Sequence, residues 1–97
     1  MKAKLIEHTK VTDEYDNIIE IKVWSVRKSP DKPHGYKYSL VYIANNKRTI
    51  GYDNAEQKGD HRHYEAIEEP YSFSSLRKLA DDFFDDIETY KRKHYES

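Results

Sequence analysis

The chain has 97 residues, a formal net charge of −1 and no cysteine. Its length suits one small domain, 1–97, with a modest core, and the lack of cysteine excludes a disulfide framework or a thiolate metal site. The first seven residues lack the apolar run of a signal peptide, and no stretch approaches the ~20 apolar residues of a membrane span. We therefore expect a cytoplasmic protein.

Charge is segregated along the chain. Lysine and arginine dominate residues 22–48, whereas acidic residues are dense over 65–69 and 81–88. A near-neutral protein with a basic half can bind a polyanion on one face, although ordinary solvated charge accounts for the same balance.

Alternation of apolar and polar residues predicts the first two strands. The first is expected over 2–11, with Leu5 pointing inward. Residues 18–26 alternate more clearly and are rich in β-branched side chains. Trp24 falls on the more polar face, either as a packing residue or as a stacking surface for a ligand. The apolar residues of the opposite face are Ile19, Ile21 and Val23.

Two further strands follow a loop at 27–35, which contains two prolines. Residues 36–44 and 47–52 alternate again, and Asn45–Asn46 between them suits a tight turn because asparagine tolerates positive φ. Short connections favour an antiparallel meander of about four to six strands. The basic side chains of the loop are Arg27, Lys28, Lys32 and His34.

The best-defined element is a helix near the end of the chain. Ser72 is the expected N-cap, with Tyr71 and Leu76 spaced as a hydrophobic staple. One apolar stripe comprises Leu76, Leu79, Ala80, Phe83, Ile87 and Tyr90. The expected solvent face comprises Lys78, Asp82, Asp85, Asp86, Thr89 and Lys93. We predict an α+β fold in which the antiparallel sheet packs against this single long helix.

Between the sheet and the helix lies the most informative stretch, 51–64, with the sequence G-Y-D-N-A-E-Q-K-G-D-H-R-H-Y. It is almost free of core-forming residues, so we expect a polar surface loop. Residues 61–67 are expected to return as a short strand, ended by Glu68-Glu69-Pro70. Its histidines titrate near neutral pH and its cations bind phosphate. Residues 60–63 are the candidate active centre.

The order of several blocks resembles the TumE family of small prokaryotic toxins. The most specific part is Tyr52-Asp53-Asn54 followed by Lys58-Gly59-Asp60-His61-Arg62-His63. Weaker matches are Val23-Trp24, His34-Gly35-Tyr36-Lys37-Tyr38 and Glu69-Pro70-Tyr71. The resemblance implies the toxin of a type II toxin–antitoxin system, neutralised by a helix-turn-helix protein encoded beside it. It also implies ribonuclease activity.

A metal-independent ribonuclease needs a base for the 2′-hydroxyl, an acid for the leaving oxygen and a cation for the phosphate. His61 and His63 share one side of an extended chain and can divide the acid and base work. Lys58 is the expected phosphate ligand. Arg62 would join it only if a bulge after Gly59 turned its side chain to the same face.

Other residues of the stretch complete the predicted site. Asp60 or Asp53 would orient an imidazole by accepting its second N–H, and Tyr52 or Tyr64 would stack a base. Asn54 is the remaining expected substrate-binding residue.

Three alternatives stay open. The stretch can be a loop closed by Asx-turns, with incidental histidines. It can hold Zn²⁺ or Mn²⁺, with ligands from the set Asp53, Asp60, His61 and His63. The protein can instead be a binding module for a partner protein or RNA that uses the basic region 27–48, and exposed strand edges would permit a homodimer. We expect His34 to belong to the proline loop, and His8 and His94 to face solvent.

Overall fold

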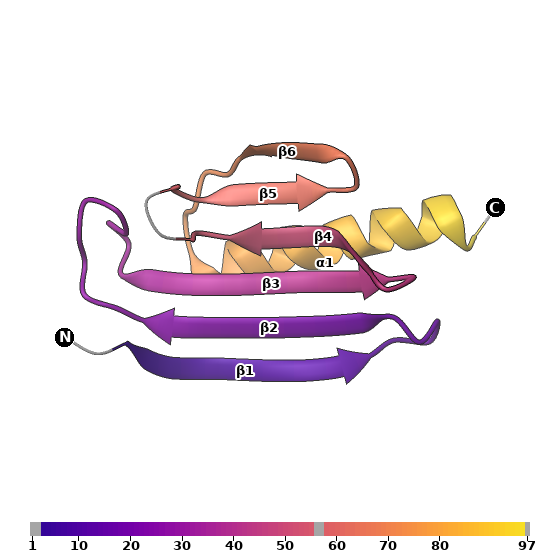
Figure 1. Ribbon diagram of the computed structural model, residues 1–97, viewed down its shortest axis with the longest axis horizontal. Helices are drawn as coiled ribbons and strands as arrows, with labels where there is room; N and C mark the ends of the chain where they lie inside the picture. Colours follow the sequence, from indigo (N-terminus) through magenta and orange to yellow (C-terminus); the bar gives the residue numbers. More distant parts are fainter. Residues whose placement is uncertain (1–2, 56–57, 97) are drawn as a thin grey trace.

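The computed structural model describes residues 3–55 and 58–96, and over these ranges the chain forms a six-stranded antiparallel sheet with one helix against one face (Figure 1). Strands that follow each other in sequence are neighbours in the sheet. The elements are β1 (Lys4–Thr12), β2 (Ile18–Ser25), β3 (Tyr36–Ala44), β4 (Lys47–Asp53), β5 (His61–Tyr64), β6 (Ile67–Pro70) and α1 (Leu76–His94). The predicted α+β class and the antiparallel meander are confirmed.

The core lies between α1 and the sheet face that α1 covers, called here the helix face. Alternate residues of each strand point to it, and α1 supplies the apolar stripe predicted from its spacing. The buried apolar residues are Ile19, Ile21, Val23, Tyr38, Leu40, Tyr42, Ala44, Ile50, Tyr52, Leu79, Phe83, Ile87 and Tyr90. The opposite side of the sheet, called here the open face, is turned away from α1 and faces the reader in Figure 1.

The turn between β3 and β4 forms where the sequence predicts it. Asn45 and Asn46 have φ values of 55° and 61°, in the left-handed region that asparagine tolerates. Two residue pairs beyond the turn, the pairing of β3 with β4 shifts between Ile43 and Tyr42, which marks a bulge.

The end of the sheet differs from the prediction. The single strand expected over 61–67 is a hairpin, because Glu65 adopts a φ of 52° and the chain reverses there. Residues 68–70 therefore do not end the sheet but belong to β6. Pro70 is tolerated because β6 is an edge strand, where a missing N–H breaks no interior ladder.

The first strand is the least well predicted. Leu5, expected inward, is 51% exposed, because its register places it opposite Trp24 on the open face. A bulge between Leu5 and Glu7 then shifts the alternation. Val11 also stays exposed because α1 packs most closely against β4, far from this edge. The expected start of the strand at residue 2 lies outside the described residues.

The helix begins after Ser75, not after the predicted Ser72. Ser75 has an extended backbone, and its hydroxyl accepts a hydrogen bond from the backbone N–H of Lys78 at 3.0 Å. This bond satisfies one of the free N–H groups at the helix start.

The residues before the helix stay outside it, and their aromatic side chains contact different partners. The Tyr71 hydroxyl donates to Asp82 on α1. The Phe73 ring lies 4.0 Å, centroid to centroid, from the ring of His34. With α1 starting at Leu76, the predicted staple between Tyr71 and Leu76 is wrong.

Ser75→Ala should lower the free energy of unfolding by about 1 kcal/mol, because it removes the N-cap acceptor. Ser72→Ala is the matched control and should change it by less than about 0.5 kcal/mol, since Ser72 is exposed and lies outside α1. Urea unfolding followed by circular dichroism measures both values. Equal losses would show that the cap contributes nothing.

Candidate functional site

The polar stretch around β5 is divided between the two faces of the sheet. β5 is a regular strand paired with β4, so successive side chains point to opposite sides. Arg62 pairs with Tyr52 on the helix face, whereas His61 pairs with Asp53 on the open face. The four residues 60–63 therefore do not converge on one centre.

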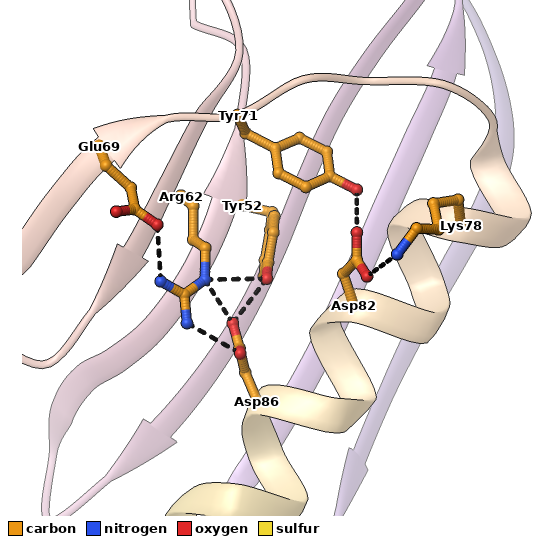
Figure 2. A network of polar contacts seen from close by, with 7 residues as sticks. All are labelled: Tyr52, Arg62, Glu69, Tyr71, Lys78, Asp82 and Asp86. Carbon is orange, nitrogen blue, oxygen red and sulfur yellow. Dashed lines mark hydrogen bonds and ion pairs between the residues drawn. The ribbon is translucent and has the colours of Figure 1, made fainter.

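On the helix face, Arg62 is fully engaged (Figure 2). Its guanidinium donates to Asp86 of α1 through Nε at 2.8 Å and through Nη2 at 2.9 Å. Nε also lies 3.1 Å from the Tyr52 hydroxyl, and Nη1 donates to Glu69 of β6 at 2.8 Å. We call Arg62, Asp86, Tyr52 and Glu69 the Arg62 network. It joins β4, β5 and β6 to the helix.

Electrostatics in the Arg62 network favour the charged arginine and the neutral phenol. The hydrogen bonds to Asp86 raise the pKa of Arg62, an effect that partial burial opposes. Burial and the hydrogen bond to Asp86 raise the pKa of Tyr52, which donates its proton to Asp86 at 2.6 Å. The prediction that Asp86 lies on the solvent face of α1 is wrong, because its carboxylate pairs with a cation that the helix pattern does not reveal.

Asp82, one turn earlier on α1, also pairs with other side chains of the protein. The prediction that it lies on the solvent face is therefore wrong as well. It accepts from the Tyr71 hydroxyl and from Lys78 (Figure 2). Burial alone would raise the pKa of Asp82, but these two bonds outweigh it and the pKa is lowered.

Asp60 does orient an imidazole, but that of His34. Its carboxylate accepts from His34 Nε2 at 2.9 Å and from the Tyr38 hydroxyl at 2.6 Å. His34 Nδ1 accepts from the backbone N–H of Tyr36 at 3.2 Å, so the ring proton sits on Nε2. Both ring nitrogens of His34 are therefore used. Burial and the bond to Asp60 raise the pKa of Tyr38, which stays a neutral donor.

Asn54 is used to hold the backbone. It is buried, accepts from the N–H of Tyr38 at 3.0 Å and donates to the carbonyl of Tyr36 at 2.7 Å. The amide thereby takes over the pairing with β3 just where β4 ends at Asp53. Tyr64, also on the helix face, has its ring 5.2 Å from the guanidinium carbon of Arg62.

The open face keeps the two imidazoles. His61 and His63 are two residues apart on β5, which puts their Cβ atoms about 7 Å apart. Asp53 lies directly opposite His61, with Cβ atoms about 5 Å apart for such a pair. His61 Nε2 and His63 Nδ1 are shielded from solvent and have no hydrogen-bond partner among the described residues. An orphaned ring nitrogen of this kind is rare in a finished hydrogen-bond network.

Two cations flank the imidazoles. Arg48 lies across Gly51, where a Cβ atom would come within 3.3 Å of Arg48 Cδ, and its Nη1 is 3.6 Å from Asp53 Oδ2. Gly51 faces His63 across the strand pair. Lys58 lines a shallow depression beside His61, together with Glu68 and Pro70.

Arg48 was not predicted from the sequence. The available signal was Gly51, since a glycine inside a strand often marks a place where another group passes close to the backbone. The bulge beside Arg48 hides the signal, because it breaks the alternation that would assign Arg48 a face.

The four candidate metal ligands are not brought together. Asp60 is bonded to His34 and Tyr38 on the helix side, while Asp53, His61 and His63 lie on the open face. Within 3–55 and 58–96, no group of three or more His, Asp or Glu side chains has the arrangement of a metal site.

Comparison with known protein families assigns the chain to a family. The family described as Toxin TumE matches residues 2–91, from the first strand almost to the end of α1. The chain belongs to the TumE toxin family. Membership makes it a toxin and suggests an antitoxin partner. No curated protein and no solved structure matches the chain. No helix within the described ranges of this TumE family member is long and apolar enough to cross a membrane.

Asp86→Ala should lower the free energy of unfolding by about 2 kcal/mol, because Arg62 would keep its half-buried charge without its main acceptor. The neighbouring exposed residue gives the control: Asp85→Ala should have an effect within about 0.5 kcal/mol. Urea unfolding measures both.

The same pair tests whether the Arg62 network positions β5. Amide hydrogen exchange in β5 should be faster in Asp86→Ala than in Asp85→Ala. Equal exchange and equal stability in the two variants would contradict a role for the network.

Proposed function

We propose that this TumE family member is the toxin of a type II toxin–antitoxin system and a metal-independent endoribonuclease. One observation supports the proposal most directly: His61 and His63 share the open face, with Asp53 opposite His61 and Arg48 lying over Gly51, the residue opposite His63. These are the groups that cleavage by the RNA 2′-hydroxyl requires.

The proposed reaction assigns one task to each side chain. His61, opposite the Asp53 carboxylate, takes the proton of the 2′-hydroxyl. The 2′-oxygen attacks phosphorus, and the bond to the 5′-oxygen breaks. His63, protonated, gives its proton to that leaving oxygen. The products are a 2′,3′-cyclic phosphate and a free 5′-hydroxyl, and Arg48 and Lys58 stabilise the charge on the phosphate.

The open face is suited to a polyanion. Its basic side chains outnumber its acidic ones. The basic residues that the register places on this face are Lys10, Lys22, Lys37 and Arg48, with Lys58 at its margin; the acidic ones are Glu20, Asp53 and Glu68. The helix on the other side has balanced charges, with five acidic residues (Asp81, Asp82, Asp85, Asp86 and Glu88) and five basic ones (Arg77, Lys78, Lys91, Arg92 and Lys93), whereas basic residues outnumber acidic ones on the open face. RNA would therefore be attracted to the face that holds the two imidazoles.

The proposal changes the expected roles of five residues. All five are assigned to the scaffold, because their polar groups or rings face α1 or are bonded within the protein. They are Arg62, Tyr52, Tyr64, Asn54 and Asp60. Asp53 and Lys58 keep the tasks predicted from the sequence, and Arg48 takes the place of Arg62 as the second phosphate ligand.

His61→Ala and His63→Ala should each reduce RNA cleavage by roughly 10²–10⁴-fold, the usual worth of a positioned acid or base. His94→Ala is the matched control, since His94 lies at the end of α1 and binds Glu65. Growth arrest on expression in bacteria and cleavage of a labelled RNA measure both. Equal toxicity of the wild type and the double variant His61→Ala/His63→Ala would overturn the mechanism.

The metal alternative gives a different result. A nucleotide with a 2′-deoxy sugar at the cleavage site should resist the proposed reaction, and EDTA should leave activity intact. Cleavage of the deoxy substrate, or loss of activity in EDTA that Mn²⁺ or Zn²⁺ restores, would favour a metal-dependent nuclease instead.

The remaining candidate is a binding module without catalysis. The lysines of the open face favour it. In that case charge reversal at Lys22 and Lys37 would abolish toxicity, whereas the histidine variants would stay toxic.

We further propose that the antitoxin is a helix-turn-helix protein encoded beside the toxin, and that the pair acts in the cytoplasm. Family membership supports the antitoxin. The uncovered edges of β1 and β6 also permit a homodimer. Co-expression of the neighbouring gene should restore growth and give a co-purifying complex. A neighbouring gene that does neither would contradict the assignment.

A further inference from the structure

Trp24 is the only tryptophan of the chain, and it lies on the open face. Its strand β2 turns Ile19, Ile21 and Val23 into the core, so Trp24 points the other way, opposite Lys37 of β3. Trp24 is only partly buried there, so part of this large aromatic side chain stays accessible on a face away from the core.

The surroundings of Trp24 combine an aromatic ring with cations. A depression in the open face is lined by Lys22, Trp24, Lys37, Ser39 and Asp53, among others. The Nζ atom of Lys37 lies 5.6 Å from the centre of the Trp24 ring. Proteins that hold single-stranded nucleic acid use this combination, in which a base stacks on the ring and the backbone phosphates meet the cations.

The depression borders the proposed cleavage site. Asp53 lines the depression and also stands opposite His61. Lys22, Ser39, Asp53 and His61 form one row across β2, β3, β4 and β5. Three strand spacings of about 4.8 Å separate the two ends of that row, or about 15 Å. A few nucleotides of single-stranded RNA cover such a distance.

We propose that Trp24, with Lys22 and Lys37, forms a nucleobase-stacking subsite that holds single-stranded RNA a few nucleotides from the bond to be cleaved. This inference rests on the proposed ribonuclease function and names its substrate class. A base inside a duplex cannot offer its face to Trp24, so paired RNA is excluded from the subsite.

The single tryptophan gives a direct test. His61→Ala protein, which binds without cleaving, is titrated with a single-stranded oligoribonucleotide, a duplex of the same length and inorganic polyphosphate. Stacking predicts saturable quenching of Trp24 fluorescence by the single strand, little by the duplex and none by polyphosphate. Equal quenching by polyphosphate, or RNA binding without quenching, would overturn the inference.

Substitutions provide the second measurement, by anisotropy of a labelled single strand in the same His61→Ala background. Trp24→Ala should weaken binding by about 10-fold or more, and Trp24→Phe should weaken it less because phenylalanine still stacks. Removing both Lys22 and Lys37 should reduce the slope of log affinity against log salt by about 1.4. Lys93→Ala, at the end of α1, should leave the slope unchanged. Wild-type affinity in Trp24→Ala would overturn the subsite.

The outcomes separate the two proposals. If the wild-type protein cleaves RNA in a histidine-dependent way but Trp24 does not respond, only the subsite is wrong. If Trp24 stacks RNA but the histidine variants remain toxic, the cleavage mechanism is wrong and the subsite stands.

Discussion

The ion pair between Arg62 and Asp86 is the contact on which the arrangement of this sheet edge depends. Every residue of β5 is half-buried and every residue of β6 is exposed, so apolar burial holds this hairpin only weakly. A guanidinium with bonds on Nε, Nη1 and Nη2 joins the hairpin to α1 instead. The bonds offset the cost of withdrawing the charges from water, and they leave the opposite side of β5 for His61 and His63.

Several polar side chains of the stretch 51–64 therefore hold neighbouring segments of the protein in place. Asn54 pairs with the main chain of β3, and Asp60 binds His34 and Tyr38 just before β5 begins. A low content of apolar residues makes this stretch look like a solvated loop, but Tyr52, Asn54, Asp60 and Arg62 all find partners inside the protein. Buried polar groups need such partners, and each partner comes from a distant part of the chain.

Local patterns predict the elements, whereas contacts between residues far apart in the sequence decide the remaining details. Alternation identified the core face of β2 and β3, and the three-and-four spacing identified the stripe of α1. The start of α1 was misplaced because Ser72 and Ser75 look equivalent until the partners of Tyr71 and Phe73 are known. Asp86 was assigned to solvent because its partner Arg62 is on another element, and helical periodicity carries no information about cross-element ion pairs.

In the candidate site, too, local patterns predict one part of the arrangement and distant contacts decide the other. Strand periodicity was enough to put both imidazoles on one side and Arg62 on the other. The cation that actually accompanies the imidazoles, Arg48, depends on a bulge and on the β4–β5 register, neither of which the sequence displays.

Gly51 gives that cation an unusual freedom. Because the strand has no side chain there, the stem of Arg48 rests on bare backbone, with its guanidinium 3.6 Å from Asp53. With 45% of its side chain exposed, Arg48 can swing toward an arriving anion without leaving a closed pocket. In the proposed ribonuclease, this freedom would let Arg48 meet differently placed phosphates of a flexible RNA strand.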